Sequence, residues 1–401
     1  MLHRIKDELM NGIIPFWTSL HDSEHGGFYG YMDYDLNVDK KAEKGCILNS
    51  RIMWFFSRAY VELGDESLLR EAKHAYDFLK NYCIDETYGG IYWSLTYDGK
   101  PFDNTKHTYN QAFAIYALAE YYEASKDEEA LRMALEIFEI IESKCRDEEG
   151  YCEAFTREFN PVANHKLSEN GVIAERTMNT ALHVIEAYTQ LYKVTAGIEE
   201  HEQVGQKLAA LLNIVRSKIY NADKRRQEVF FDGKYRSLLD LHSYGHDIEA
   251  SWLIDRAVEV LGENALTKEA LDDIKKITLE MASETYEKAY NGRYFVNECE
   301  NGVVDETGIW WVQAEAMVGF VNAFMKTEDT RYLKGAETLW DFVEESLIDK
   351  REGSEWFWEV SPDGTPSKKP IVEPWKCPYH NGRMCFELMK ILGWRRENND
   401  T

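Results

Sequence analysis

The chain lacks paired cysteines and long apolar runs. Its seven cysteines are odd in number and include no CxxC pair, which argues against a disulfide framework and a zinc knuckle. Scattered single cysteines are typical of a reducing compartment, so we expect a cytoplasmic protein. The N-terminal 17 residues have no apolar core of the signal-peptide type, and no other stretch is long enough to span a bilayer.

Positive charge is also scarce. Lysine and arginine number 46 against 71 acidic residues, which gives a net charge of −25. A surface of this charge repels phosphates, so we expect neither nucleic acid nor an anionic membrane as a partner.

Aromatic residues, by contrast, are abundant at 13%, with 11 Trp and 24 Tyr. They fit either a bulky core or ring platforms for a sugar, and composition does not choose between the two.

Apolar residues recur at helical spacing in pairs of segments along most of the chain. The predicted pairs are 47–63 with 67–82, 109–124 with 128–145, 178–194 with 203–220, 247–261 with 266–286, and 310–325 with 332–347. An opening helix near 5–20 and a closing helix near 379–392 bring the count to about twelve. The pattern therefore predicts an all-α protein built from a repeated helical hairpin.

A second element recurs after every second helix. Aromatic and polar residues roughly alternate in segments that begin at Gly26, Gly89 and Gly150, with looser copies from Glu228, Gly292 and Glu355. Such segments are typical of short hairpins. Six helical hairpins with interleaved strands predict a closed (α/α)6 barrel with the hairpins on one face. An open tetratricopeptide-like solenoid is the alternative, but the period is too long for it. No linker interrupts the pattern, so we expect a single domain over residues 1–401.

The segment from Ser243 to Trp252, SYGHDIEASW, contains the first candidate for chemistry. Gly245 is placed to open a helix, which puts His246 in its first turn and Glu249 on the same face. A helix N-terminus disfavours the imidazolium, so His246 would stay neutral and available as a base. A capping histidine beside a solvent-facing glutamate is the structural alternative.

A second candidate is His380, which follows a stiff loop containing Trp375 and two prolines. Pro378 suits the first turn of the last helix. The loop and His380 would make a pocket wall, although an ordinary connector fits the same pattern. Further polar residues lie near the starts of alternate helices, which a barrel gathers at one end. They are Asn179 with His183, Trp311 with Glu315, and Arg51.

These residues carry a resemblance that runs essentially end to end. GHDIEASWL from Gly245, TMNTALH from Thr177, WWVQAE from Trp310 and PWKCPYHNGRMCFE from Pro374 resemble the N-acylglucosamine 2-epimerase superfamily, and within it the cellobiose 2-epimerases. The resemblance implies an (α/α)6 barrel that needs neither a metal nor a nucleotide cofactor. It implies His246 and His380 as the acid/base pair, with His183 as a helper. The substrate-binding residues that it implies are Arg51, Tyr109, Asn179, Glu249, Trp252, Trp311, Glu315 and Trp375.

The reaction of that family inverts C2 of the reducing-end glucose in a β-1,4-linked disaccharide or oligosaccharide. Two opposed groups with pKa values near neutrality suit this proton transfer, and histidine is the natural choice. An N-acylglucosamine 2-epimerase or a mannose isomerase of the same superfamily is one alternative. An inverting glycoside hydrolase with Glu249 and Glu315 as its carboxylates is another. A non-catalytic sugar-binding protein would use the tryptophans but not the histidines. We expect a monomer.

Overall fold

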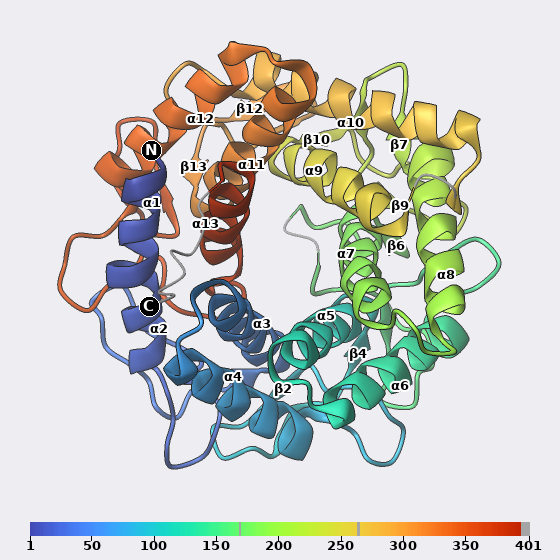
Figure 1. The fold of residues 1–401 in the computed structure, drawn as a ribbon, viewed down its shortest axis with the longest axis vertical. Coiled ribbons are helices and arrows are strands. Elements are labelled where there is room, and N and C mark those ends of the chain that lie inside the picture. Colours follow the sequence, from blue (N-terminus) through green and yellow to red (C-terminus); the bar gives the residue numbers. More distant parts are fainter. Residues whose placement is uncertain (168–169, 263–264, 394–401) are drawn as a thin grey trace, which may run out of the picture.

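Six helices form the inner ring of a closed barrel (Figure 1). The computed structural model describes residues 1–167, 170–262 and 265–393, so the expected domain of 1–401 includes residues outside that range. The inner helices are α3 (Cys46–Leu63), α5 (Thr108–Ser125), α7 (Met178–Val194), α9 (Tyr244–Leu261), α11 (Trp310–Thr327) and α13 (Tyr379–Ile391). Each inner helix contacts its neighbours, and contact of α13 with α3 closes the ring.

Six outer helical segments surround the inner ring. They are α1 (Leu2–Glu8) continued by η1 (Leu9–Ile13) and α2 (Ile14–Ser19), α4 (Glu66–Phe78) with η2 (Leu79–Cys83), α6 (Glu128–Lys144), α8 (His201–Ile214) with η3 (Val215–Ile219), α10 (Lys268–Ala289), and α12 (Thr330–Phe342) with η5 (Val343–Leu347). The η segments are π-helical turns. The first outer segment packs against the last inner helix through contacts between α1 and α13. The arrangement confirms the predicted (α/α)6 barrel.

Sequence composition separates the two rings. The inner helix α5 is buried from Thr108 to Ala114 without interruption, as expected for a helix that is covered on all sides. The outer helices α4, α6 and α12 instead have one buried stripe, and each follows a capping aspartate. The side chains of Asp65, Asp127 and Asp329 accept hydrogen bonds from backbone amides two residues later. These caps lie two residues after the ends of α3, α5 and α11, so short turns join these three inner helices to their outer partners.

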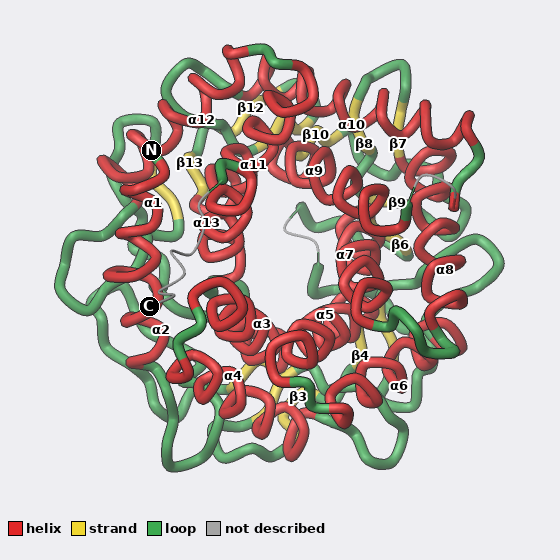
Figure 2. Tube along the Cα trace, viewed as in Figure 1, coloured by secondary structure: helices red, strands yellow, loops and turns green. Residues whose placement is uncertain are grey.

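Short strands join neighbouring repeats around the ring (Figure 2). They are β1 (Lys44–Gly45), β2 (Ser94–Leu95), β3 (Pro101–Asp103), β4 (Lys106–His107), β5 (Ala154–Phe155), β6 (Arg176–Thr177), β7 (Tyr220–Asn221), β8 (Arg226–Gln227), β9 (Phe230–Phe231), β10 (Leu241–Ser243), β11 (Glu298–Glu300), β12 (Val303–Asp305), β13 (Gly308–Ile309) and β14 (Glu359–Val360). The strand before an inner helix pairs antiparallel with the strand after the next outer helix, as in β1–β2, β4–β5, β6–β9, β10–β11 and β13–β14.

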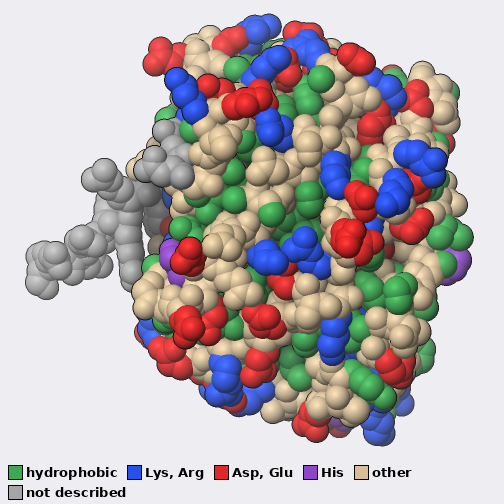
Figure 3. Space-filling view, turned by 90° about the vertical axis from the view of Figure 1, so that its right-hand side faces the viewer, with side chains coloured by type: hydrophobic (Ala, Val, Ile, Leu, Met, Phe, Trp, Pro, Cys, Tyr) green, Lys and Arg blue, Asp and Glu red, His purple; other side chains and the backbone are tan. Residues whose placement is uncertain are grey.

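A bridge between Met32 and Val372 supplies the sixth such pairing and links the two ends of the chain. The expected hairpins exist within repeats as β2–β3, β7–β8 and β11–β12, but the regular pairing runs between repeats. Acidic and basic side chains intermingle on the wall of the barrel in Figure 3. Within the described ranges, no helix is both long and apolar enough to cross a membrane.

Candidate active site

A cavity of about 250 Å³ opens where the N-terminal parts of the inner helices converge. All six inner helices contribute to its wall, through Arg51, Tyr109, His183, His246, Trp311 and His380 among others. Each helix N-terminus carries a partial positive charge. The fold therefore places six such ends around one space, where they favour negative charge that develops on a ligand and disfavour imidazolium.

Nine of the eleven predicted site residues line this cavity. They are Arg51, Tyr109, Asn179, His183, His246, Glu249, Trp311, Trp375 and His380. The other two, Trp252 and Glu315, were expected to bind substrate directly, but the structure does not place them in the wall. The indole nitrogen of Trp252 donates to Oε2 of Glu315 over 3.0 Å. Both side chains are buried behind the cavity, where Glu315 contacts His380.

His246 lies in the first turn of α9, as predicted, and Gly245 explains how it approaches the neighbouring helix. A Cβ atom at Gly245 would come within 2.6 Å of the Trp311 ring, so only glycine lets α9 and α11 pack this closely. The imidazole of His246 contacts the same indole, with ring centroids 4.8 Å apart. Burial, with a smaller effect of His183, lowers the pKa of His246 to about 3, so the ring is neutral at pH 7.

His380 reaches the cavity from the second residue of α13. Its Nδ1 lies 2.7 Å from Oε1 of Glu315, and its ring centroid lies 5.4 Å from that of Trp311. Burial and the nearby guanidinium of Arg383 hold its pKa well below the usual value. The two histidines that the sequence singled out therefore contact one indole, His246 from α9 and His380 from α13.

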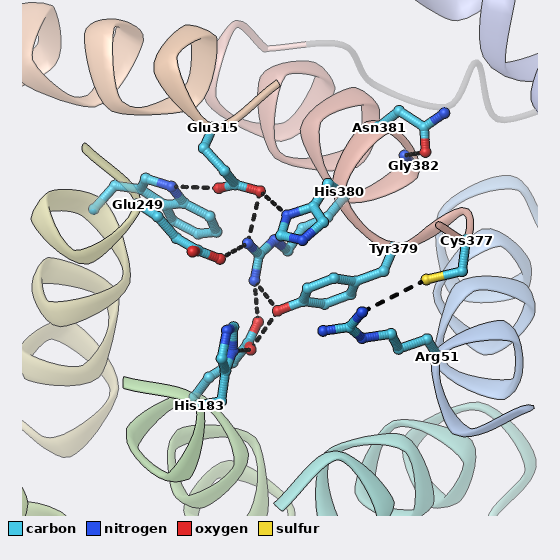
Figure 4. Close-up of polar contacts among 12 residues, drawn as sticks. Arg51, His183, Glu249, Glu315, Cys377, Tyr379, His380, Asn381 and Gly382 are labelled. Atoms are coloured by element: carbon cyan, nitrogen blue, oxygen red, sulfur yellow. Dashed lines mark hydrogen bonds and ion pairs between the residues drawn. The ribbon is translucent and has the colours of Figure 1, made fainter. Parts of the chain in front are cut away.

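A buried ionic network connects His380 to His183 (Figure 4). Arg383 donates to Glu186, Glu249 and Glu315, and to the hydroxyl of Tyr379. Glu186 also accepts from Tyr379 and lies 2.9 Å from Nδ1 of His183. One cation thus connects three carboxylates, two of which contact imidazoles. No spacing pattern in the sequence indicated Glu186, Tyr379 or Arg383 as site residues.

The carboxylates of this network differ in their readiness to ionise. Burial and the neighbouring Glu315 raise the pKa of Glu249 to about 7. Burial also raises the pKa of Glu315, although Arg383 opposes that shift. For Glu186 burial acts in the same direction, but Arg383 and His183 outweigh it and lower the pKa to about 2. Near neutral pH, Glu249 can therefore both gain and lose a proton.

Arg51 lies on the opposite side of the network from Glu315 (Figure 4). Its guanidinium donates to the hydroxyl of Tyr109 over 2.8 Å and to the backbone carbonyl of Trp375 over 3.4 Å. It also stacks over the ring of Phe113 at 4.1 Å. Within the described part of the chain, no carboxylate neutralises Arg51, so its charge remains available to an anionic group in the cavity.

Several buried polar atoms of the cavity wall have no hydrogen-bond partner within the described chain. They are Nε of Arg51, Oδ1 of Asn179 and Oε2 of Glu249. Buried polar atoms are nearly always paired in folded proteins. A donor and two acceptors left unpaired around one cavity indicate a ligand that offers both kinds of group, as a sugar hydroxyl does.

The structure also brings together one set of groups with the spacing of a metal site. Ligand atoms of Glu249, Glu315 and His380 lie within 4.8 Å of one another. However, Arg383 already donates to both carboxylates. The guanidinium supplies the positive charge that a metal ion would bring, so the donor set fits a metal poorly. The expectation of a metal-free site stays a prediction.

The remaining wall is aromatic and mixed in charge. Four tryptophans line the cavity, namely Trp310, Trp311, Trp358 and Trp375, together with Lys166, Asn170, Asn297, Glu298 and Lys369. Flat rings with interspersed hydrogen-bonding groups suit the apolar faces and hydroxyls of a sugar. Fold and site together define an (α/α)6-barrel protein with a carbohydrate-sized pocket that contains three imidazoles.

Comparison with known proteins identifies the family to which the chain belongs. Residues 26–382 match the model of the N-acylglucosamine 2-epimerase (GlcNAc 2-epimerase) family. A cellobiose 2-epimerase of Eubacterium cellulosolvens is 52% identical over 395 residues, which cover 96% of each chain. A solved sugar epimerase from a ruminal bacterium superposes with a TM-score of 0.94 at 49% identity, covering 99% of this chain and 100% of its own. The chain belongs to the N-acylglucosamine 2-epimerase family.

The same comparisons rank the branches of this family. The solved cellobiose 2-epimerase of Bacillus thermoamylovorans B4167 is 45% identical, with a TM-score of 0.92 and coverage of 97% of this chain and 98% of its own. The N-acylglucosamine 2-epimerase of Rattus norvegicus is only 23% identical over 97% of this chain and 91% of its own. The chain is thus an epimerase, and its similarity is much greater to the disaccharide branch.

Proposed function

We propose that the protein inverts C2 of the reducing-end glucose of β-1,4-linked disaccharides, so that cellobiose becomes glucosyl-mannose and lactose becomes epilactose. The observation that carries this proposal is the contact of His246 and His380 with Trp311 at the wall of one cavity. Inversion at a carbon needs one group to remove a proton and another to return a proton on the opposite face. Two imidazoles carried by different helices are suited to this task.

The proposed reaction starts with opening of the reducing-end ring, because the free C1 aldehyde acidifies the hydrogen on C2. One histidine removes that hydrogen as a proton, and the bonding electrons pass into the enediolate. The other histidine returns a proton to C2 from the opposite face. His183 is the proposed helper for proton transfers on the sugar oxygens, since its Nδ1 is held by Glu186.

The enediolate is the most highly charged species of this sequence. Arg51 has no carboxylate partner in the described chain and lies in the cavity wall, so its guanidinium is the proposed partner of the enediolate oxygens. The six inner-helix N-termini act in the same direction. Asn179 and Glu249 have unpaired oxygens and are the proposed partners of sugar hydroxyls, with Tyr109, Trp311 and Trp375 as further contacts.

Hydrolysis of the glycosidic bond fits the site less well. An inverting hydrolase needs two carboxyl groups roughly 6.5–9.5 Å apart, with a water between them and the sugar. Oxygens of Glu249 and Glu315 lie within 4.8 Å, Arg383 binds both, and Glu315 is not part of the cavity wall. The hydrolase alternative also leaves the histidines without a role.

The remaining partner and location proposals rest on general features. A net charge of −25 supports a neutral sugar rather than nucleic acid or an anionic membrane as the partner. All seven cysteines are free thiols in the structure, which supports a reducing cytoplasm. We propose a monomer, because the six inner helices of a single chain already enclose the cavity.

Incubation with cellobiose in D₂O tests the reaction directly. NMR of the reducing-end sugar is expected to reveal deuterium at C2, a growing mannose signal and an intact glycosidic bond. Released glucose would instead indicate a hydrolase, and an unchanged sugar would contradict the proposal. N-acetylmannosamine and free mannose in parallel reactions test the other branches of the family.

Substitution of each histidine tests the assignment of the acid/base pair. His246→Ala and His380→Ala are each expected to abolish turnover while the thermal unfolding midpoint stays close to that of the wild type. Phe357→Ala, which removes a partly buried ring that is not part of the cavity wall, controls for loss of a ring. Robust turnover by either histidine variant would remove that residue from the mechanism.

A further inference from the structure

The hydroxyl of Ser243, at the start of α9, contacts a side chain and not a backbone amide. Ser243 occupies the N-cap of this helix, but its side chain accepts no hydrogen bond from the helix backbone. Its Oγ lies instead 2.7 Å from Nδ1 of His246. Serine at this position normally caps a free amide of the first turn. Here the hydroxyl contacts the side chain of the third helical residue.

The matching position of another inner helix has the ordinary arrangement. Thr177 occupies the N-cap of α7, and its hydroxyl accepts from the amide of Thr180 over 3.0 Å. The N-cap hydroxyl of α9 is therefore used differently from that of α7, and the N-cap residues of the other four inner helices carry no hydroxyl. The start of α9 is also held by a separate pair, because Asp247 contacts His242 over 2.9 Å and accepts from the amide of Gln227. The helix does not depend on a serine cap.

The two histidines of the proposed acid/base pair consequently differ in the group that contacts Nδ1 of the ring. Nδ1 of His380 lies against the carboxylate of Glu315, whereas Nδ1 of His246 lies against a neutral hydroxyl. Among the described residues, no carboxylate bonds to the ring of His246. A carboxylate stabilises the charged imidazolium ring. A hydroxyl oxygen also accepts a hydrogen bond from a ring N–H, but it does not strongly favour the charged ring.

We propose that Ser243 is a positioning residue that fixes the tautomer and orientation of His246 for proton transfer at C2. This inference rests on the proposed epimerase function. In this proposal Nδ1–H of His246 donates to Oγ of Ser243, which leaves the lone pair on Nε2 of a ring that lines the cavity. When the C2–H bond breaks, Nε2–H forms and the electron pair enters the enediolate. The bond from Nδ1–H to Ser243 persists throughout.

A kinetic comparison tests this role. Ser243→Ala is expected to lower kcat for cellobiose epimerisation by about 10- to 100-fold, while KM changes little. This is less than a full general-base contribution of about 10²- to 10⁴-fold, because the imidazole itself remains. Its thermal unfolding midpoint is expected to match the wild type, because no backbone cap is lost. Ser243→Thr restores a hydroxyl and is expected to recover most of kcat. Wild-type kcat in Ser243→Ala would overturn the proposal.

A spectroscopic test needs no substrate and so separates this proposal from the proposed function. The wild-type protein is labelled with ¹⁵N-histidine, and the His246 signals are assigned by their loss in His246→Asn. The expected wild-type ring carries its proton on Nδ1, and Ser243→Ala is expected to shift the population toward the Nε2–H tautomer. A wild-type ring protonated on Nε2, or a tautomer unchanged in Ser243→Ala, would overturn the proposal even if cellobiose is epimerised.

Discussion

Oε1 of Glu315 lies 2.7 Å from Nδ1 of His380 and accepts a second hydrogen bond, also 2.7 Å long, from Arg383. The other oxygen of the same carboxylate accepts from the indole of Trp252. Both oxygens are thus committed, and the carboxylate has a fixed orientation towards the imidazole. Because Glu315 is on α11 and His380 on α13, this bond sets the position of His380 relative to the neighbouring helix.

Glu315→Gln is therefore expected to impair catalysis more than folding. The amide keeps the size of the side chain but removes the charge that stabilises a proton on His380. We expect kcat to fall by about 10²-fold or more, as for loss of support to an acid/base group. Steady-state kinetics on cellobiose measures the effect, with circular dichroism as the control for folding. A kcat within twofold of the wild type would contradict a supporting role.

The raised pKa of Glu249 predicts a pH-dependent cost to stability. The folded state holds this proton up to a pH of about 7, whereas the unfolded chain releases it near its ordinary pKa of about 4.3. The folded state therefore binds more protons between these values, and the stability from Glu249 is lost as pH rises from about 4.3 through 7. Each unit of pKa difference corresponds to about 1.4 kcal/mol.

Glu249→Gln removes this titration. As the pH rises from 5 to 8, the free energy of unfolding of the variant is expected to increase by about 2–3 kcal/mol relative to that of the wild type. Urea unfolding of both proteins at the two pH values measures the difference, and comparison with the wild type cancels the other titrating groups. A constant difference across this range would mean that the carboxyl group does not titrate there.

The fold was predictable because the helical pairs repeat in the sequence. The inner and outer helices and the first-turn position of His246 follow from local patterns. The partner of each short strand was not predictable in this way. β1 pairs with β2 across an intervening helical hairpin, and a two-residue strand has too few residues to specify its register.

The site was predictable only where local sequence or family resemblance pointed to a residue. Arg383 and Glu186 lie 197 positions apart. In the sequence, neither residue differs from an ordinary charged residue of a helix. Their meeting depends on closure of the ring, which brings α13 beside α3 and across from α7. Glu315 and Trp252 were found by resemblance, but their place behind His380 follows from side-chain packing that no spacing reveals.

Chelator treatment is expected to leave activity unchanged. Of the three groups with metal-like spacing, Glu249 and Glu315 already accept hydrogen bonds from Arg383, and the third, His380, already contacts Glu315. Initial rates after dialysis against EDTA, with and without added Mn²⁺ or Zn²⁺, provide the measurement. Loss of activity on chelation with recovery on addition of one ion would contradict the expectation and assign a metal to this cluster.

Arg383 is expected to be a main determinant of stability in the centre of the barrel. Its guanidinium is buried and pairs with Glu186, Glu249 and Glu315. Arg383→Met keeps an unbranched side chain but leaves these carboxylates without their cation. Removal of one partner from a buried ion pair typically costs about 3–5 kcal/mol, and protonation of the carboxylates at low pH recovers part of that loss.

The matched control for Arg383→Met is Arg331→Met. Arg331 pairs with Asp329 on the surface, where an ion pair adds little to stability. Urea unfolding at pH 7 is expected to reveal a large loss for Arg383→Met and almost none for the control. The loss at position 383 is expected to shrink at pH 5, because carboxylates freed of the arginine take up protons. Equal effects of the two substitutions would show that the buried network is not what holds the inner helices in register.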